Sequence, residues 1–282
     1  MMNKDTTFAI VGLGLLGGSY AKGLKEAGYH VYGVARREET ITYALEHNYI
    51  DEGSIDPALV AKADIIICCL YPSILIKWIE DNKKFFKPSA IISDVSGVKH
   101  TIVEPIQEIL TNTTNEFIAT HPMAGRETSG IEYANTEMFK SANFIIVPTE
   151  KNTQHAVDTM WSLAEILAFH HISILSIEEH DRMIGFLSQL THVIAVSLMN
   201  THDDEKLVDY TGDSFRDLTR IAKINEHMWS ELFLYNKEIL LEEITKFQES
   251  LNDFKETLQT ENIDKMKMLF TQSTKRRKKF DK

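Results

Sequence analysis

Three segments lie at the carboxyl ends of apolar, strand-like runs. They are Leu70-Tyr71-Pro72, Asp94-Val95-Ser96-Gly97-Val98-Lys99 and Thr120-His121-Pro122-Met123-Ala124-Gly125. Ligands of open α/β sheets bind at the carboxyl ends of the strands, so we expect the three segments to meet at one edge of a sheet. The imidazole of His121, fixed by the proline that follows it, has the chemistry of a general base for a hydroxyl group.

Each of these side chains also has a plainer explanation. A histidine that follows a strand is often part of a structural turn, and Ser96 has the position of the N-cap of a helix that starts near Val98. Lys99 would then be a surface lysine in the first turn of that helix. The residue types alone leave both interpretations open.

A second group of polar side chains lies in the C-terminal half. His192 stands inside an otherwise apolar helical pattern, where a lone histidine is usually a satisfied core residue. Asp217 and Arg220 are three residues apart, so on one helix they could pair and present a guanidinium to an anion. The alternative is a surface ion pair.

The elements that would position these groups begin with a glycine turn near the N-terminus. An apolar run leads into Gly12-Leu13-Gly14-Leu15-Leu16-Gly17, and an amphipathic helical pattern follows. Gly12 permits a tight turn, Gly14 lacks the Cβ that would keep the backbone away from a pyrophosphate, and Gly17 lets the helix pack close to its strand. The N–H groups at the start of the helix then face the phosphates. The motif predicts a dinucleotide site.

The end of the second strand predicts which dinucleotide is preferred. An acidic residue for the ribose 2′-hydroxyl is expected about twenty residues after the glycines, but the strand ends in Ala35, followed by Arg36 and Arg37. Guanidinium groups would bind a 2′-phosphate that a carboxylate would repel. The sequence therefore favours NADP over NAD. In the alternative, Arg36 stacks on the adenine and Glu38 or Glu39 binds the ribose.

Strand-like and helix-like segments alternate up to about residue 176, which is typical of βαβ units and a parallel sheet. The predicted strands cover 7–12, 30–35, 64–70, 90–95, 117–120, 144–148 and 171–176. The predicted helices between them cover 15–27, 40–48, 74–84, 98–110 and 154–169.

After Ser176 the pattern is helical throughout, and helices are predicted over 178–202, 228–259 and 261–279. A helix over 228–259 would be roughly 45 Å long and needs neighbours along its length, which favours a homodimer. We therefore predict an α/β, Rossmann-type N-terminal domain over 1–176, and an all-α C-terminal domain over 177–282 that binds substrate and dimerises.

Composition narrows the class of protein. The net charge of −11 and a pI near 5.5 argue against a nucleic-acid or membrane-surface partner, and the basic run at 275–279 is interpreted as a solvated helix end. Cys68 and Cys69 are neighbours in one strand and point to opposite faces, so neither a disulfide nor a metal site is expected. The sequence has neither a signal peptide pattern nor an apolar stretch of membrane-spanning length. A cytoplasmic protein with a small-molecule substrate is expected.

Five segments occur in an order that resembles one family. They are Gly12 to Gly17, Asp94 to Lys99, His121-Pro122-Met123-Ala124-Gly125, Leu190 to Ala195 around His192, and Phe215 to Ala222. The chain resembles, over nearly its whole length, the prephenate dehydrogenase family of tyrosine biosynthesis, which includes arogenate dehydrogenases. The resemblance implies oxidative decarboxylation of prephenate to 4-hydroxyphenylpyruvate with hydride transfer to NAD(P), and the Ala35-Arg36 pair looks like the NADP-preferring branch.

The resemblance also implies roles for individual residues. His121 would take the proton of the substrate's C4 hydroxyl, and Ser96 would hold the same hydroxyl and touch the nicotinamide end. Arg220 would bind a substrate carboxylate and His192 the other polar arm. Further family-like positions are a charged gate formed with Arg220 by Glu127 and Asp217, an aromatic lid at Trp229, and cofactor contacts at residues 12–17, Ala35, Arg36, Arg37, Leu70 and Ser96.

Other functions remain open at this point. An arogenate dehydrogenase, which would convert L-arogenate to L-tyrosine, differs only in the substrate's side chain. A β-hydroxyacid dehydrogenase would also join a Rossmann-type domain to a helical one, but it would carry a lysine in a glycine-rich helix, and no such lysine follows Gly185 or Gly212. An NADP(H)-sensing module would bind the dinucleotide and need no base at His121.

Overall fold

The computed structural model describes residues 2–125 and 128–281. The chain divides into two compact units, residues 1–236 and residues 237–282. This division falls later than the boundary predicted after residue 176, because several helices that follow the sheet pack within the first unit. The assignment of residues 177–282 to one substrate-binding and dimerising domain stays a prediction.

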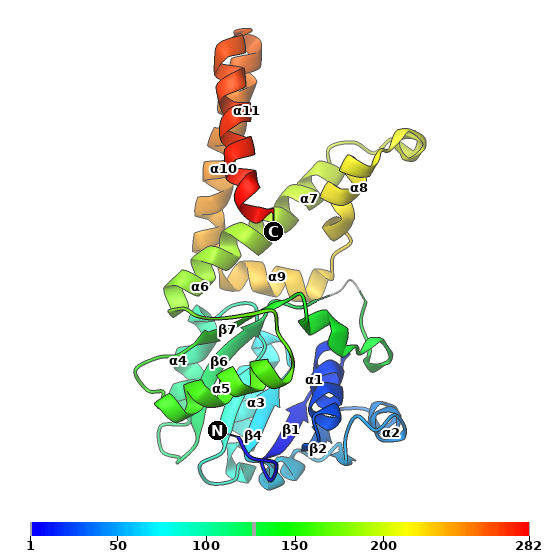
Figure 1. The fold of residues 1–282 in the computed structure, drawn as a ribbon, viewed down its shortest axis with the longest axis vertical. Coiled ribbons are helices and arrows are strands. Elements are labelled where there is room, and N and C mark those ends of the chain that lie inside the picture. The colour runs from blue at the N-terminus through cyan, green and yellow to red at the C-terminus, as the bar shows by residue number, and fades with distance from the viewer. Residues whose placement is uncertain (1, 126–127, 282) are drawn as a thin grey trace. The chain divides into compact units, whose positions relative to one another are not determined.

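Within the described residues, eight strands form one sheet in the order β3-β2-β1-β4-β5-β6-β7-β8 (Figure 1). The strands are β1 (Thr7–Val11), β2 (His30–Val34), β3 (Glu52–Ser54), β4 (Ile65–Cys68), β5 (Ile91–Asp94), β6 (Glu116–Pro122), β7 (Asn143–Val147) and β8 (His171–Ile174). Strands β3 to β6 in this order run parallel, whereas β7 is antiparallel to β6 and parallel to β8. The chain crosses from one half of the sheet to the other beside β1, which is where ligands bind in such sheets.

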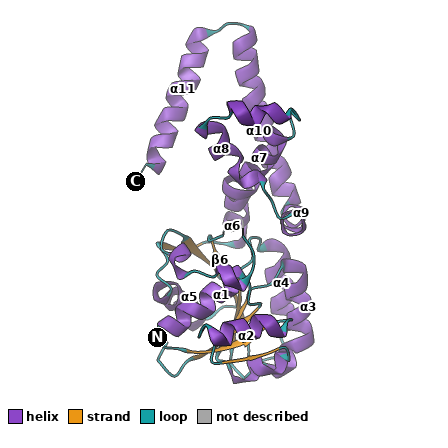
Figure 2. Cartoon of the chain, turned by 90° about the vertical axis from the view of Figure 1, so that its right-hand side faces the viewer, coloured by secondary structure: helices purple, strands orange, loops and turns teal. Residues whose placement is uncertain are grey.

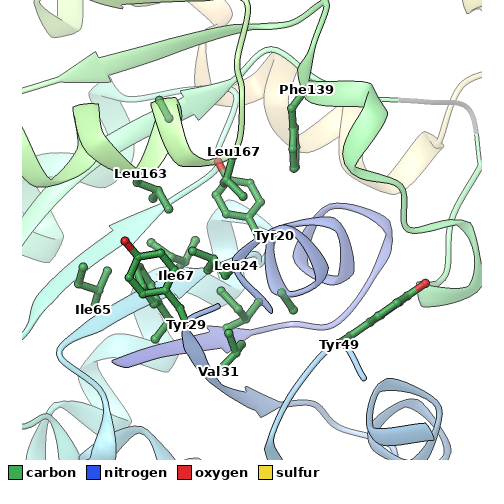
Figure 3. Close-up of a cluster of buried hydrophobic side chains, with 14 of the residues drawn as sticks. Tyr20, Leu24, Tyr29, Val31, Tyr49, Ile65, Ile67, Phe139, Leu163 and Leu167 are labelled. Atoms are coloured by element: carbon green, nitrogen blue, oxygen red, sulfur yellow. The ribbon is translucent and has the colours of Figure 1, made fainter. Parts of the chain in front are cut away.

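Helices cover both faces of the sheet. The buried side chains of α1 (Leu15–Glu26), α2 (Glu38–Glu46) and α5 (Gln154–Ile166) pack in one hydrophobic cluster, and those of α3 (Pro72–Asn82) and α4 (His100–Ile109) pack in another. Figure 3 shows the first cluster, in which Tyr20 and Leu24 of α1 face Ile67 of the sheet and Leu163 of α5. All seven predicted strands and all five predicted helices of this region are present.

One strand is missing from the prediction. Strand β3 consists of Glu52, Gly53 and Ser54 and pairs in parallel with the end of β2. Its residues are polar or small, so neither an apolar run nor an alternation marks it. The pairing of the backbone alone makes it a strand.

The rest of the first unit is helical. Helix α6 (Ile177–Ile184) continues through a π-helical turn (Gly185–Leu190) into α7 (Thr191–Met199), and α8 (Asp213–Thr219) and α9 (Glu226–Tyr235) follow. The second unit contains α10 (Lys237–Gln259) and α11 (Ile263–Arg277), which form a helical hairpin (Figure 2). Inside this hairpin the ring centroids of Phe254 and Phe270 are 6.1 Å apart.

The prediction of one uninterrupted helix over 228–259 is wrong. Helix α9 ends at Tyr235 and α10 begins at Lys237, because Asn236 leaves the helical conformation with φ −117° and ψ 25°. The buried Asn236 amide donates hydrogen bonds to the carbonyl oxygen of Asp181 and to Oε1 of Gln189. These two bonds to groups far away in the sequence offset the backbone bonds that the break removes.

The expectation that the chain lacks an apolar stretch of membrane-spanning length is also corrected. The helical run Ile177–Met199 is 23 residues long and contains a window with a mean hydropathy of 1.3. Length and composition alone identify this run, and core helices of soluble proteins have the same properties. Its buried polar side chains, His180, Asp181 and Gln189, are hydrogen-bonded inside the first unit.

Candidate active site

The glycine turn after β1 has the shape that the motif predicts. Gly12 has a φ of +92°, and a Cβ there would overlap the carbonyl oxygen of Cys69. A Cβ on Gly17 would overlap the carbonyl oxygen of Gly12. These two glycines are therefore required by the packing of the turn against β4 and α1.

Gly14 has a different surrounding. Nothing lies within 4 Å of the place where its Cβ would be, and it is the N-cap of α1 without a side-chain capping bond. The N–H groups of the first turn of a helix have no acceptor inside the helix, and α1 has no acidic residue in that turn. Open space beside Gly14 and unpaired donors at the start of α1 fit the pyrophosphate of a dinucleotide. Leu13 is buried in the core, and Leu70 lies beside Gly12.

The end of β2 lies next to this turn, because Val34 pairs with Val11 in the sheet. The backbone N–H of Ala35 donates to the carbonyl oxygen of Ser54, so the unpredicted strand β3 fixes this end of β2. Arg36 and Arg37 are exposed, and neither forms an ion pair with another described residue. Their guanidinium groups are free to bind a phosphate at this edge.

A buried ion pair organises the end of β5. The Lys99 ammonium donates to the Asp94 carboxylate at 2.7 Å and to the carbonyl oxygen of Thr120 at 2.6 Å, and both charged side chains are fully buried. Asp94 also accepts the backbone N–H groups of Ser96 at 2.8 Å and Thr120 at 3.2 Å. Burial lowers the pKa of the Lys99 ammonium, while the Asp94 charge acts in the opposite direction.

The plainer explanations for Ser96 and Lys99 are therefore wrong. Helix α4 begins at His100 with Lys99 as its N-cap, so Ser96 does not cap it, and Lys99 is buried rather than exposed. The hydroxyl oxygen of Ser96 is buried and has no hydrogen-bond partner among the described residues. A buried hydroxyl without a partner is suited to binding a polar group of a ligand.

His121 lies at the end of β6, half-buried, with its Nε2 facing the Ser96-Gly97 turn. A Cβ on Gly97 would be 3.8 Å from that nitrogen. The other ring nitrogen, Nδ1, lies 2.9 Å from Nε2 of His180, and Nδ1 of His180 lies 2.7 Å from Oδ1 of Asp181. Burial lowers the pKa of His121 well below its usual value, and His180 and Lys99 lower it further. The imidazole is neutral near pH 7 and can accept a proton.

Sequence reasoning missed His180 and Asp181. Both lie on α6. His180 comes 59 residues after His121, and no spacing rule connects these two histidines. The only local signal is an adjacent histidine and aspartate at the start of a helix, which usually belong to the surface.

Helix α9 brings aromatic and apolar groups to this edge of the sheet. The ring of Trp229 stacks on His192, with centroids 3.6 Å apart and an interplanar angle of 29°. Nδ1 of His192 lies 2.8 Å from the carbonyl oxygen of Ser188. Three residues after Trp229, the side chain of Leu232 would be 3.6 Å from a Cβ on Gly97. The structure thus places His192 and Trp229 together, on the helices above the His121 end of the sheet.

Asp217 and Arg220 do not share one continuous helix. Helix α8 ends at Thr219, and Arg220 belongs to the short 3₁₀ turn that follows. Among the described ion pairs on this helix, Arg216 pairs with Asp213 at 2.8 Å, and none joins Asp217 to Arg220. Glu127, predicted to form a gate with these two residues, lies outside the described residues.

The described part of the chain contains no group of three or more histidine, cysteine, aspartate or glutamate side chains placed to hold a metal ion. Cys68 and Cys69 are free thiols, and burial raises the pKa of each.

Two protein-family models match consecutive parts of this chain and together cover most of it. The model of the prephenate dehydrogenase nucleotide-binding domain matches residues 20–171, and that of the prephenate dehydrogenase dimerization domain matches residues 176–272. A prephenate dehydrogenase of Lactococcus lactis subsp. cremoris is 33% identical over 254 residues, which are 86% of this chain and 69% of that protein.

Two solved structures are similar over almost the full length. The structure of prephenate dehydrogenase from Aquifex aeolicus in complex with hydroxyphenyl propionate and NAD+ has a TM-score of 0.90 and 28% identity, covering 99% of this chain and 100% of that one. The structure of Synechocystis arogenate dehydrogenase has a TM-score of 0.85 and 26% identity, covering 98% and 100%. The chain belongs to the prephenate dehydrogenase family of nicotinamide-dependent oxidoreductases.

Proposed function

We propose that this chain oxidises and decarboxylates prephenate to 4-hydroxyphenylpyruvate in tyrosine biosynthesis. The observation that carries the proposal is the position of His121. Its Nε2 faces the Ser96-Gly97 turn, at the same sheet edge as the glycine turn after β1. A base and a dinucleotide site side by side are what oxidation of a ring hydroxyl requires. The similar Aquifex aeolicus enzyme in complex with hydroxyphenyl propionate and NAD+ supports an aromatic product of this size.

The residues present fit the cofactor. Gly12, Gly14 and Gly17 with the first turn of α1 would hold the pyrophosphate, and Leu70 would line the turn. When bound, the nicotinamide supplies the hydride acceptor for the carbon that carries the hydroxyl.

His121 is proposed as the base. Its neutral Nε2 accepts the hydrogen bond and then the proton of the C4 hydroxyl, and the buried Oγ of Ser96 holds the same oxygen. Loss of the proton and the hydride leaves a ketone opposite the ring carboxylate. Loss of CO2 then makes the ring aromatic, so the overall step runs in one direction.

The remaining predicted residues would bind the rest of the substrate. Arg220 is proposed to bind a carboxylate, and His192, held by Trp229 and Ser188, to contact the other polar arm. Asp217 and Glu127 stay proposals for a charged gate with Arg220, and Trp229 stays a proposal for an aromatic lid.

NADP is proposed as the preferred cofactor. Ala35 stands at the end of β2 where an NAD site would have a carboxylate, and the exposed Arg36 and Arg37 that follow it would attract a 2′-phosphate. Glu38 and Glu39 in the first turn of α2 are exposed nearby and support the NAD alternative.

A cytoplasmic homodimer is proposed as the working form. The match of residues 176–272 to a dimerization domain supports it. So do the exposed apolar side chains of the run 186–199, which include Phe186, Leu187, Leu198 and Met199, because large apolar groups in one stretch usually meet a partner.

The test is reduction of NAD and NADP, followed by absorbance, with prephenate and with L-arogenate as substrates in all four pairings. Turnover with prephenate and NADP is the expected result. Turnover with arogenate alone would mean that L-arogenate, not prephenate, is the substrate. Turnover with NAD alone would contradict the proposed binding of a 2′-phosphate by Arg36. Absence of turnover in all four pairings would overturn the proposed function.

A further inference from the structure

His121, which is half-buried, is the first of three side chains joined by hydrogen bonds. Nδ1 of His121 lies 2.9 Å from Nε2 of His180, and the two rings meet edge to face with centroids 5.1 Å apart. Nδ1 of His180 lies 2.7 Å from Oδ1 of Asp181. His180 is fully buried and Asp181 is 1% exposed. Water therefore does not compete for the bond between His180 and Asp181.

The Asp181 carboxylate is fixed as an acceptor. Its Oδ1 accepts the backbone N–H of Lys99 at 2.9 Å, and its Oδ2 accepts that of His100 at 2.8 Å. These two N–H groups stand at the N-terminus of α4, where a helix favours a negative charge. With backbone donors on both oxygens, Asp181 has only acceptor capacity left for His180.

A second set of hydrogen bonds holds the backbone of helix α6 at Asp181. The Asn236 amide donates to the carbonyl oxygen of Asp181 at 3.0 Å and to Oε1 of Gln189 at 2.8 Å. Gln189 in turn donates to the carbonyl oxygen of Leu232 at 3.0 Å. Helix α6 is thus tied to the π-helical turn and to α9, which holds the backbone of Asp181 in place.

We propose that His180 and Asp181 are positioning residues that set the tautomer of His121. Because Asp181 accepts, Nδ1 of His180 must donate, and the neutral ring then has its lone pair on Nε2. That lone pair must accept from Nδ1–H of His121. The lone pair of His121 is therefore on Nε2, the nitrogen that faces the Ser96-Gly97 turn.

This inference rests on the proposed function and deepens it. The proton of the substrate hydroxyl passes to Nε2 of His121, and the resulting positive charge is shared through the Nδ1–H bond with His180 and Asp181. Lys99 is the opposing charge in the same cluster, and its own partner is Asp94. Without His180, Nδ1 of His121 would have no acceptor and the ring would prefer the proton on Nε2, which blocks its use as a base.

The direct test is nitrogen-15 NMR of the full-length protein labelled at histidine, which distinguishes protonated from unprotonated ring nitrogens without any substrate. The signals of His121 and His180 are assigned as those lost in His121→Asn and His180→Gln. The expected result is an unprotonated Nε2 and a protonated Nδ1 on His121. A protonated Nε2 on His121 in the unsubstituted protein would overturn the proposal.

Two substitutions at His180 separate positioning from structure. In His180→Gln, Asp181 accepts the amide N–H and the amide oxygen accepts from His121, so the tautomer is kept and kcat falls less than about tenfold. In His180→Met the acceptor is lost, so the tautomer reverses and kcat falls about 10²-fold or more. The KM for prephenate changes little in both.

The control is the same substitution, histidine to methionine, at a position far from the proposed site. His30 forms an exposed pair with Asp51 at 3.6 Å on β2, and His30→Met is expected to leave kcat and the His121 signals unchanged. Equal kcat in His180→Gln and His180→Met would overturn the positioning role. Absence of turnover in the unsubstituted protein, with the expected tautomer present, would instead contradict the proposed function alone.

Discussion

The ammonium of Lys99 and the carboxylate of Asp94 form an ion pair of 2.7 Å in which neither side chain is exposed to solvent. The pair joins two strands, because Lys99 also donates to the carbonyl oxygen of Thr120 and Asp94 accepts the N–H of Thr120. Thr120 immediately precedes His121, and the backbone N–H of Ser96 donates to the same carboxylate. The relative position of the proposed base and the buried Ser96 hydroxyl thus depends on this pair.

Lys99→Met is expected to destabilise the fold strongly. Removal of one partner leaves the Asp94 carboxylate buried without its counter-charge, which costs about 3–5 kcal/mol. Denaturant unfolding of the two proteins measures the difference. Lys62→Met is the control, since Lys62 pairs with Glu52 where both side chains are about half exposed, and it should change the free energy of unfolding little. Equal effects of the two substitutions would contradict the role of the buried pair.

Gly14→Ala and Gly17→Ala are expected to differ in their effects on cofactor affinity and on melting temperature. A Cβ at position 14 would meet open space, so the melting temperature should hold while cofactor affinity falls, because the methyl group occupies the path of the pyrophosphate. A Cβ at position 17 would overlap the carbonyl oxygen of Gly12, so the melting temperature should fall as well. Calorimetry of unfolding and of NAD(P) binding separates the two quantities. A Gly17→Ala protein with unchanged melting temperature would mean that the turn has room to open.

His121→Asn is expected to lose about 10²–10⁴-fold in kcat with little change in substrate affinity, because the lost group acts on the proton rather than in binding. Burial holds the pKa of His121 well below 6.5, so kcat/KM of the unsubstituted enzyme should stay level as the pH falls through 6.5 and drop tenfold per unit only at lower pH. The variant should lack this acid limb. An unchanged kcat would remove His121 from its role as base.

The same shift predicts how stability depends on pH. The pKa values of His121 and His180 are lowered in the folded protein, chiefly by burial. As the pH falls below about 6.5 the unfolded chain takes up protons that the folded chain does not, so stability falls, by up to about 1.4 kcal/mol per pH unit for each histidine. Above that pH the contribution is fully present. Unfolding free energies at pH 8, 6.5 and 5.5 should show a weaker dependence in His121→Asn, and an identical slope would contradict the shift.

Arg220→Ala is expected to raise the KM for prephenate by the equivalent of about 2–4 kcal/mol, through the loss of charged hydrogen bonds to a carboxylate. Arg216→Ala is the matched control, because Arg216 lies one turn earlier, on α8, and pairs with Asp213. Steady-state kinetics of both variants give the answer. A KM that rises only in Arg216→Ala would place the anion site at the other arginine.

The sequence by itself determined the parts of this protein that depend on neighbours in the chain. The glycine turn was predictable because the φ of Gly12 and the contact of Gly17 follow from the sterics of six consecutive residues. The strands and helices of the sheet domain were predictable because their apolar spacing is local. The place of His121 at the end of a strand followed from the same pattern.

Tertiary structure decided what depends on residues far apart. Strand β3 forms because β2 provides a backbone partner for it. The predicted long helix is interrupted at Asn236 because Asp181 and Gln189 accept hydrogen bonds from the Asn236 amide. Burial of Lys99 requires Asp94 and Thr120 around it. The hydrogen bond from His121 reaches His180, 59 residues later in the sequence, and His180 in turn bonds to its neighbour Asp181. Such pairings carry no periodic signal, because hydrogen bonds between distant segments form only after the packing of the apolar faces has brought those segments together.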